Sequence, residues 1–85
     1  MGFRKESEFV KKVENKKWQA TALNIQGVSY AIRGESAKAI DYFTRSLKIQ
    51  EEIGDKRGMA YSLINIGIIY QEQGEMAKAL DYFTR

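Results

Sequence analysis

One stretch of the chain, GESAKAIDYFTR at residues 34–45, occurs again as GEMAKALDYFTR at residues 74–85. Only two positions differ, and both changes keep a helical pattern. The offset between the two copies is 74 − 34 = 40 residues. A repeat of this length indicates that the fold is built from similar units stacked side by side. The same offset relates Leu23 to Leu63, Gly27 to Gly67, Tyr30 to Tyr70, Phe3 to Phe43, Phe9 to Ile49 and Val13 to Ile53.

Each period has the pattern of two helices. In the segment 57–73, Met59, Leu63, Ile66 and Tyr70 recur at helical spacing and form one apolar stripe. Gly74 follows this segment, in the position where glycine ends a helix. Because the chain contains no proline, glycine is its main structural breaker. One period therefore predicts an antiparallel pair of helices that must stack on its neighbours to bury its apolar stripes.

The expected helices lie near residues 3–13, 17–33, 36–53, 57–73 and 76–85. The break between the first two depends on Asn15 alone, because Glu14 and Asn15 stand where the second copy has Gly54 and Asp55. A continuous helix from about residue 6 to residue 33 is the alternative. We expect one all-α domain over residues 1–85, whose first and last residues fall within a repeat and not at its boundaries. Its parts are the end of a second-type helix at 3–15, a first repeat at 17–53 and a truncated second repeat at 57–85.

Residues at characteristic places in both copies resemble the tetratricopeptide repeat. They are Leu23, Gly27, Tyr30, Gly34, Ala39 and Phe43 in the first copy and Leu63, Gly67, Tyr70, Gly74, Ala79 and Phe83 in the second. The resemblance implies a right-handed helical solenoid. The family's usual period is about 34 residues, so the longer period is similar to the long-repeat subclass of bacterial regulators, kinesin light chains and spindle-orientation adaptors. Two departures are the missing proline after the second helix and the polar Gln26 at the position equivalent to Ile66.

The resemblance implies that the first helix of each pair lines a concave face that binds a protein or peptide. The residues of that face outside the core stripe are mostly apolar, with a few amide side chains. Among them, Asn65 resembles the asparagine of the long-repeat subclass that hydrogen-bonds to a peptide backbone. The alternative is that the apolar residues pack against neighbouring repeats or a second chain. No lysine or arginine occurs within 20–32 or 59–73, which excludes the family's recognition of a chaperone carboxylate. The expected partner-binding residues are Tyr61, Ile64, Asn65, Ile68, Gln71, Asn24, Val28 and Ile32.

Self-association is also expected, because neither end of the array has an obvious polar cap. Leu80 and Phe83 lie on a helix with no following helix to cover it, and the segment 6–13 corresponds in register to what would follow Arg85. A second copy could cover these residues head to tail or by exchanging helices. The expected contact residues are Phe3, Phe9, Val13, Leu80 and Phe83.

A second function is suggested by the basic residues of a chain with a net charge of +3. Lys11, Lys12, Lys16 and Lys17 could attract nucleic acid or an anionic surface, but glutamates interleave with them. A solvated edge of the repeat is the alternative interpretation. Trp18 stands where the second copy has Gly58 and is expected to pack at a helix start, with stacking on a ligand as the alternative.

Catalysis, cofactor binding and metal binding are not expected. Cysteine and histidine are absent, which removes thiolate and imidazole ligands and the commonest general base. No apolar run approaches the roughly 18 residues of a membrane span. The charged N-terminal stretch has no apolar core typical of a signal peptide, and we expect a cytoplasmic protein.

Overall fold

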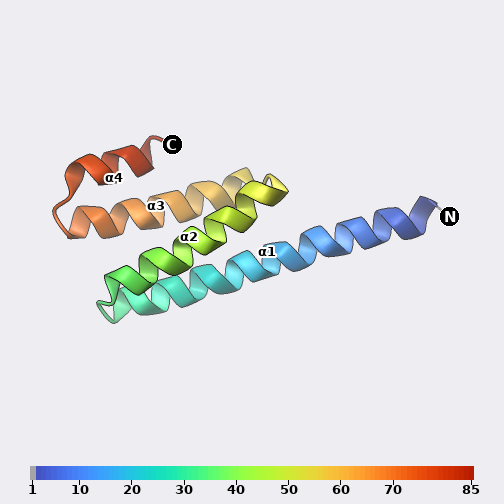
Figure 1. Ribbon diagram of the computed structural model, residues 1–85, viewed down its shortest axis with the longest axis horizontal. Coiled ribbons are helices and arrows are strands. Elements are labelled where there is room, and N and C mark those ends of the chain that lie inside the picture. The colour runs from blue at the N-terminus through green and yellow to red at the C-terminus, as the bar shows by residue number, and fades with distance from the viewer. Residues whose placement is uncertain (1) are drawn as a thin grey trace.

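The computed structural model describes the backbone of residues 2–85 and the side chains of residues 7–85. This part of the chain forms four helices: α1 (Gly2–Ile32), α2 (Ser36–Ile53), α3 (Lys56–Glu72) and α4 (Met76–Phe83). Each helix packs against the next one along the chain, so that α1–α2 and α3–α4 are antiparallel pairs lying side by side (Figure 1). The predicted all-α helical repeat is confirmed. Within the described residues, no helix has the length and apolar character of a membrane span.

Three turns of the same geometry separate the four helices. Gly34, Gly54 and Gly74 have φ angles of 78°, 68° and 79°, a left-handed conformation that glycine adopts without steric cost. After each glycine, the next backbone N–H donates to a carbonyl oxygen five residues earlier at 2.9 Å, which satisfies an otherwise unpaired carbonyl at the helix end. These bonds join Glu35 to Tyr30, Asp55 to Gln50 and Glu75 to Tyr70.

The break expected near Asn15 was wrong, because α1 continues without interruption from residue 2 to residue 32. The equivalent helix end in the second copy needs Gly54 in its left-handed conformation. The first copy has Glu14 there, and a residue with a Cβ pays about 1–2 kcal/mol in that conformation. The helix therefore continues, and Trp18 lies in its middle with 69% of its surface exposed instead of packing at a helix start.

The core lies where α2 meets α1 and α3. Its fully buried cluster contains Ala39 and Phe43 from α2 and Ile66 and Ile69 from α3. The ring of Phe43 lies directly on the backbone of Gly27, where an added Cβ would come within 2.7 Å of its Cε1 atom. The second copy repeats this contact between Phe83 and Gly67, with α4 in the place of α2.

The two copies differ in what covers their first helix. In α3, Ile66 and Ile69 are buried against α2. The equivalent positions of α1 are Gln26 and Ser29, and both are exposed. Gln26 therefore neither finds a buried partner nor weakens the core, because it faces solvent. The expectation that neither end of the array has a polar cap stays a prediction.

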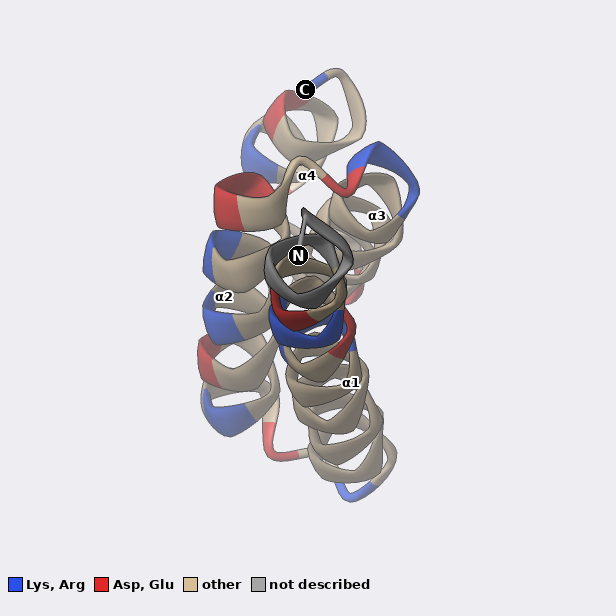
Figure 2. Ribbon diagram, turned by 90° about the vertical axis from the view of Figure 1, so that its right-hand side faces the viewer, with Lys and Arg blue, Asp and Glu red and all other residues tan. Residues whose placement is uncertain are grey.

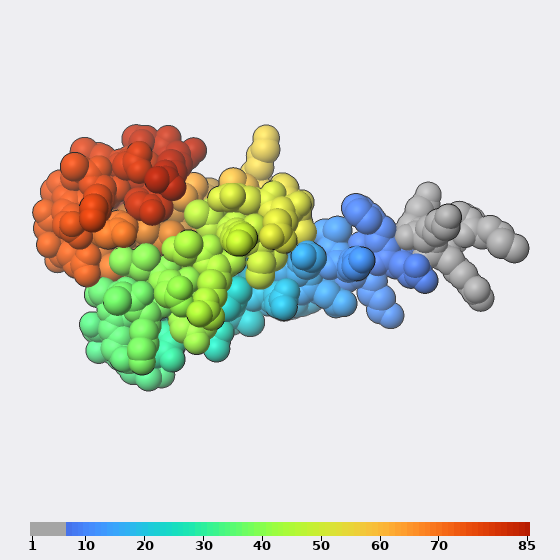
Figure 3. All heavy atoms as spheres, viewed as in Figure 1, coloured from blue at the N-terminus to red at the C-terminus, as the bar shows by residue number. Residues whose placement is uncertain are grey.

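The outline of the molecule follows from the unequal helix lengths. Figure 2 shows residues of both charges along α2, whereas α1 has no charged residue between Ala20 and Ile32. The N-terminal part of α1 extends beyond the other helices (Figure 3). The structure measures 55 × 26 × 13 Å along its principal axes.

Candidate binding groove

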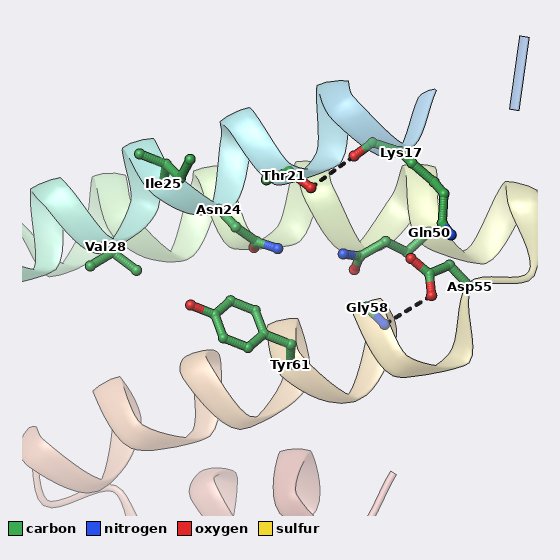
Figure 4. A pocket seen from close by; sticks show the side chains of 9 residues that line it. All are labelled: Lys17, Thr21, Asn24, Ile25, Val28, Gln50, Asp55, Gly58 and Tyr61. Atoms are coloured by element: carbon green, nitrogen blue, oxygen red, sulfur yellow. Dashed lines mark hydrogen bonds between the residues drawn. The ribbon is translucent and has the colours of Figure 1, made fainter. Parts of the chain in front are cut away.

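A groove runs between α1 and α3, with α2 behind it as its floor (Figure 4). It contains two neighbouring pockets that share Val28. The first pocket has a volume of about 450 Å³ and lies at the start of α3. The second has a volume of about 290 Å³ and lies toward the end of α3. Both volumes are close to or within the range of small-ligand sites, about 300–1,000 Å³.

The first pocket has a polar floor and mostly apolar walls. Gln50 of α2 is only 3% exposed, Asn24 of α1 is 7% exposed and Ser62 of α3 is fully buried. The Ser62 hydroxyl lies 2.7 Å from Oε1 of Gln50 and 3.2 Å from Oδ1 of Asn24. Three helices thus meet at one buried polar cluster. The pocket is lined by Lys17, Thr21, Asn24, Ile25 and Val28 of α1, by Gln50 of α2, and by Asp55, Gly58 and Tyr61.

The outer end of the first pocket is fixed by the first turn of α3. Asp55 caps this helix, because its Oδ1 accepts a 3.1 Å hydrogen bond from the backbone N–H of Gly58. A Cβ atom at Gly58 would lie 2.6 Å from both Oδ2 of Asp55 and Nε2 of Gln50. The absence of a side chain at Gly58 therefore lets the Gln50 amide approach the start of α3.

The second pocket has an apolar floor and one unpaired amide. Phe43 and Ile69 line it and are 2% and 4% exposed. Asn65 lines the same pocket, and its Nδ2 atom is buried without a hydrogen-bond partner among the described residues. A buried donor without a partner costs about 1–3 kcal/mol, and a rotation of this amide into the pocket would let it donate to a ligand.

The residues predicted to bind a partner divide into four groups. Tyr61 and Asn24 line the first pocket, whereas Asn65, Ile68 and Ile32 line the second, and Val28 lines both. Ile64 and Gln71 are exposed but do not belong to either lining. Asn24 was expected as a surface residue, yet it is buried because its side chain joins the cluster around Ser62.

Gln50 and Ser62 were missed by the sequence analysis. The family resemblance implied a binding face on the first helix of each pair, whereas Gln50 lies on α2. Its place at helical spacing after Phe43 and Leu47 on the inner stripe of α2 is the signal that could have indicated a buried polar group. Ser62 gave no signal, because a serine is common on either face of a helix.

The residues predicted for self-association lie at opposite ends of the molecule (Figure 1). Phe9 and Val13 border a third pocket beside Ile53, where α1 extends past α2. Leu80 and Phe83 of α4 are 57% and 39% exposed. The side chain of Phe3 lies outside the described residues. Self-association stays a prediction.

The predicted basic edge is spread around α1 instead of forming one face. Lys12 and Lys16 border the third pocket, and Lys16 pairs with Glu52 at 3.3 Å. Lys17 instead lines the first pocket, and Lys11 is exposed. Binding of nucleic acid through this edge stays a prediction.

The fold defines a repeat protein built from antiparallel helix pairs. The tetratricopeptide repeat family model matches residues 18–85, and the chain belongs to this family. Tetratricopeptide repeats generally mediate protein–protein interactions and act as non-catalytic scaffold modules. Comparisons with curated proteins and with solved structures gave no match.

Proposed function

We propose that this chain binds an extended peptide segment of a partner protein in the groove between α1 and α3. The observation that carries the proposal is the Nδ2 atom of Asn65, which is buried in the wall of the second pocket without a partner. A peptide backbone presents a carbonyl oxygen at every residue, so it can accept from this donor at many positions along the groove.

The surroundings of Asn65 support a protein ligand. Exposed apolar side chains border the groove on both sides, including Ile32 at 81%, Ile25 at 65% and Tyr61 at 51% exposure. A contiguous apolar surface of this kind is typical of protein-binding sites. Most of the lining comes from the uncharged stretches 20–32 and 59–71, and its charged residues are Lys17, Asp55 and Glu72. The affinity is therefore expected to depend on shape and hydrogen bonds more than on ionic strength.

The experiment compares stability with binding in the variant Asn65→Leu. Removing an unpaired buried donor is expected to stabilise the fold by up to about 1 kcal/mol. The same change should weaken binding of peptides selected from a random nonapeptide display library by about tenfold or more, because the hydrogen bond is lost. Fluorescence polarisation measures the affinity and thermal denaturation measures the stability.

Gln71→Leu is the matched control, since Gln71 is exposed on the same helix outside both pockets. It should leave the affinity unchanged. A library that yields no binder, or binders that the Asn65→Leu variant retains at full affinity, would contradict the proposal. A loss of stability in Asn65→Leu would show that Asn65 serves the fold instead.

We further propose that the chain belongs to the long-repeat subclass. The support is the 40-residue offset, 74 − 34, together with the 18-residue length of α2. The expected homo-oligomer and the cytoplasmic location also remain proposals.

A further inference from the structure

We infer that the two pockets bind two side chains of one extended peptide that are four residues apart. The first pocket takes a primary amide, that of glutamine or asparagine, and the second takes an apolar side chain. This inference rests on the proposed function and adds the sequence that the groove selects. The hydrogen-bond capacity of the first pocket sets the amide, and the distance between the pockets sets the spacing.

The floor of the first pocket has unused hydrogen-bonding groups. Ser62 lies within hydrogen-bond distance of the carbonyl oxygens of both Gln50 and Asn24. A hydroxyl has a single proton, so it donates to one of them only. The other amide satisfies the contact by turning over and donating its NH2 group to the hydroxyl oxygen, since the two ends of an amide have nearly the same shape.

Either arrangement leaves one NH2 group and one carbonyl group free. If Ser62 donates to Gln50, the NH2 group of Gln50 and the carbonyl of Asn24 are unused. If Ser62 donates to Asn24, the NH2 group of Asn24 and the carbonyl of Gln50 are unused. Both amides line the first pocket (Figure 4) and are more than nine-tenths buried. The floor therefore offers one donor and one acceptor to whatever enters.

A primary amide matches this floor, because it also has one donor group and one carbonyl acceptor. A carboxylate has acceptors alone and would face the unused carbonyl of the floor. An ammonium group has donors alone and would face the unused NH2 group. Lys17 and Asp55 have opposite charges and both line this pocket, so their charges offset each other. Burial of a charged group without a charged partner is costly, which further favours a neutral amide.

The second pocket suits an apolar side chain. Its floor is formed by Phe43 and Ile69, and Val28, Ile32 and Ile68 stand around it. Asn65 lies between these apolar residues and Tyr61 of the first pocket, one helical turn away on the same helix. Its unpaired Nδ2 atom can donate to a backbone carbonyl of a peptide that spans both pockets.

The distance between the pockets gives the spacing. On α3, residues 58–61 line the first pocket and residues 65–72 line the second. The middles of these two ranges are about nine residues apart, which corresponds to ~13 Å along a helix that rises about 1.5 Å per residue. An extended peptide covers ~13 Å in about four residues at about 3.3 Å each. An even separation also places both side chains on the same side of an extended peptide.

The test uses synthetic peptides in which Ser and Thr flank Leu and Gln four residues apart, in both orders, with binding followed by fluorescence polarisation. The better order is expected to lose about tenfold in affinity or more when Gln is replaced by Met or by Glu, because the hydrogen bonds to the floor are lost. Moving Gln to a separation of three residues should weaken binding similarly.

The variant Gln50→Met keeps the size of the floor residue and removes its amide. It should bind the Gln and Met peptides within about twofold of each other, while both complexes still depend on Asn65. Peptide binding that needs Asn65 but is indifferent to Gln, Met or Glu would overturn this inference and leave the proposed function standing. Absence of binding by every peptide, and by the library, would overturn both.

Discussion

A methyl group added at Gly27 probes how rigidly the core holds Phe43. In Gly27→Ala, the new Cβ would lie 2.7 Å from Cε1 and 2.8 Å from Cδ1 of Phe43. Phe43 is 2% exposed and packs in the cluster with Ile66 and Ile69, so its ring cannot move away from the new methyl group without disturbing that cluster. Overpacking of a filled core costs about 1–3 kcal/mol, and alanine gains about 1 kcal/mol over glycine within a helix.

The net destabilisation expected for Gly27→Ala is therefore up to about 2 kcal/mol. For a domain of this size, the upper value corresponds to a fall in melting temperature of roughly 8–15 °C. Urea and thermal denaturation followed by far-ultraviolet circular dichroism measure both quantities. The folded variant should keep the wild-type helix content, because the clash affects packing and not the helix itself.

Gly67→Ala is the internal control, since the repeat gives it the same local contact. There the Cβ would lie 2.5 Å from Cε1 of Phe83, but Phe83 is 39% exposed at the end of α4. Its ring can turn toward solvent, and the lost burial is offset by the gain in helix propensity. The change in stability is expected to stay within about 1 kcal/mol. Equal effects of the two substitutions would refute the reasoning.

Two further predictions concern the start of α3 and the outer face of α4. Asp55→Ala should destabilise the fold by about 1 kcal/mol in urea denaturation, because it removes the cap bond to Gly58. Glu75→Ala, at a cap position without a side-chain cap bond, should lower the free energy of unfolding by less. Equal losses of stability in the two variants would disprove the role of the cap. In sedimentation equilibrium, the wild-type chain should associate as its concentration rises. Leu80→Lys should shift the equilibrium toward the monomer, because Leu80 is an apolar residue that is 57% exposed. A wild-type chain that stays monomeric at all concentrations would disprove self-association.

The repeat and its helices could be predicted because the two copies carry the same turn glycines and the same small–large contacts. Where the copies diverge, the prediction was wrong. Asn15 was taken as a break, but a helix end of this type requires the left-handed conformation one residue earlier, and Glu14 does not favour it. The short α4 was predicted to reach residue 85 and ends at Phe83, which is ordinary fraying at a helix end.

The binding groove could be predicted in part. The spacing of residues along α3 identified Tyr61, Asn65 and Ile68 as one face, and all three line the groove. Helical periodicity describes one helix at a time, so it could not show that a residue of α2 forms the floor between α1 and α3. The hydrogen bonds that Ser62 makes depend on three helices meeting at one point, and no local pattern encodes that meeting.

Because α1 is one continuous helix, its two ends are rigidly coupled. Its 31 residues span about 46 Å at about 1.5 Å per residue, so whatever is joined to its first turn is held at a fixed distance and rotation from the groove. Each residue inserted between Val13 and Lys17 would advance that attachment by about 1.5 Å and swing it by about 100° around the helix axis. The number of residues in this part of α1 therefore sets both the distance of the attached group from the groove and its rotation around the helix axis.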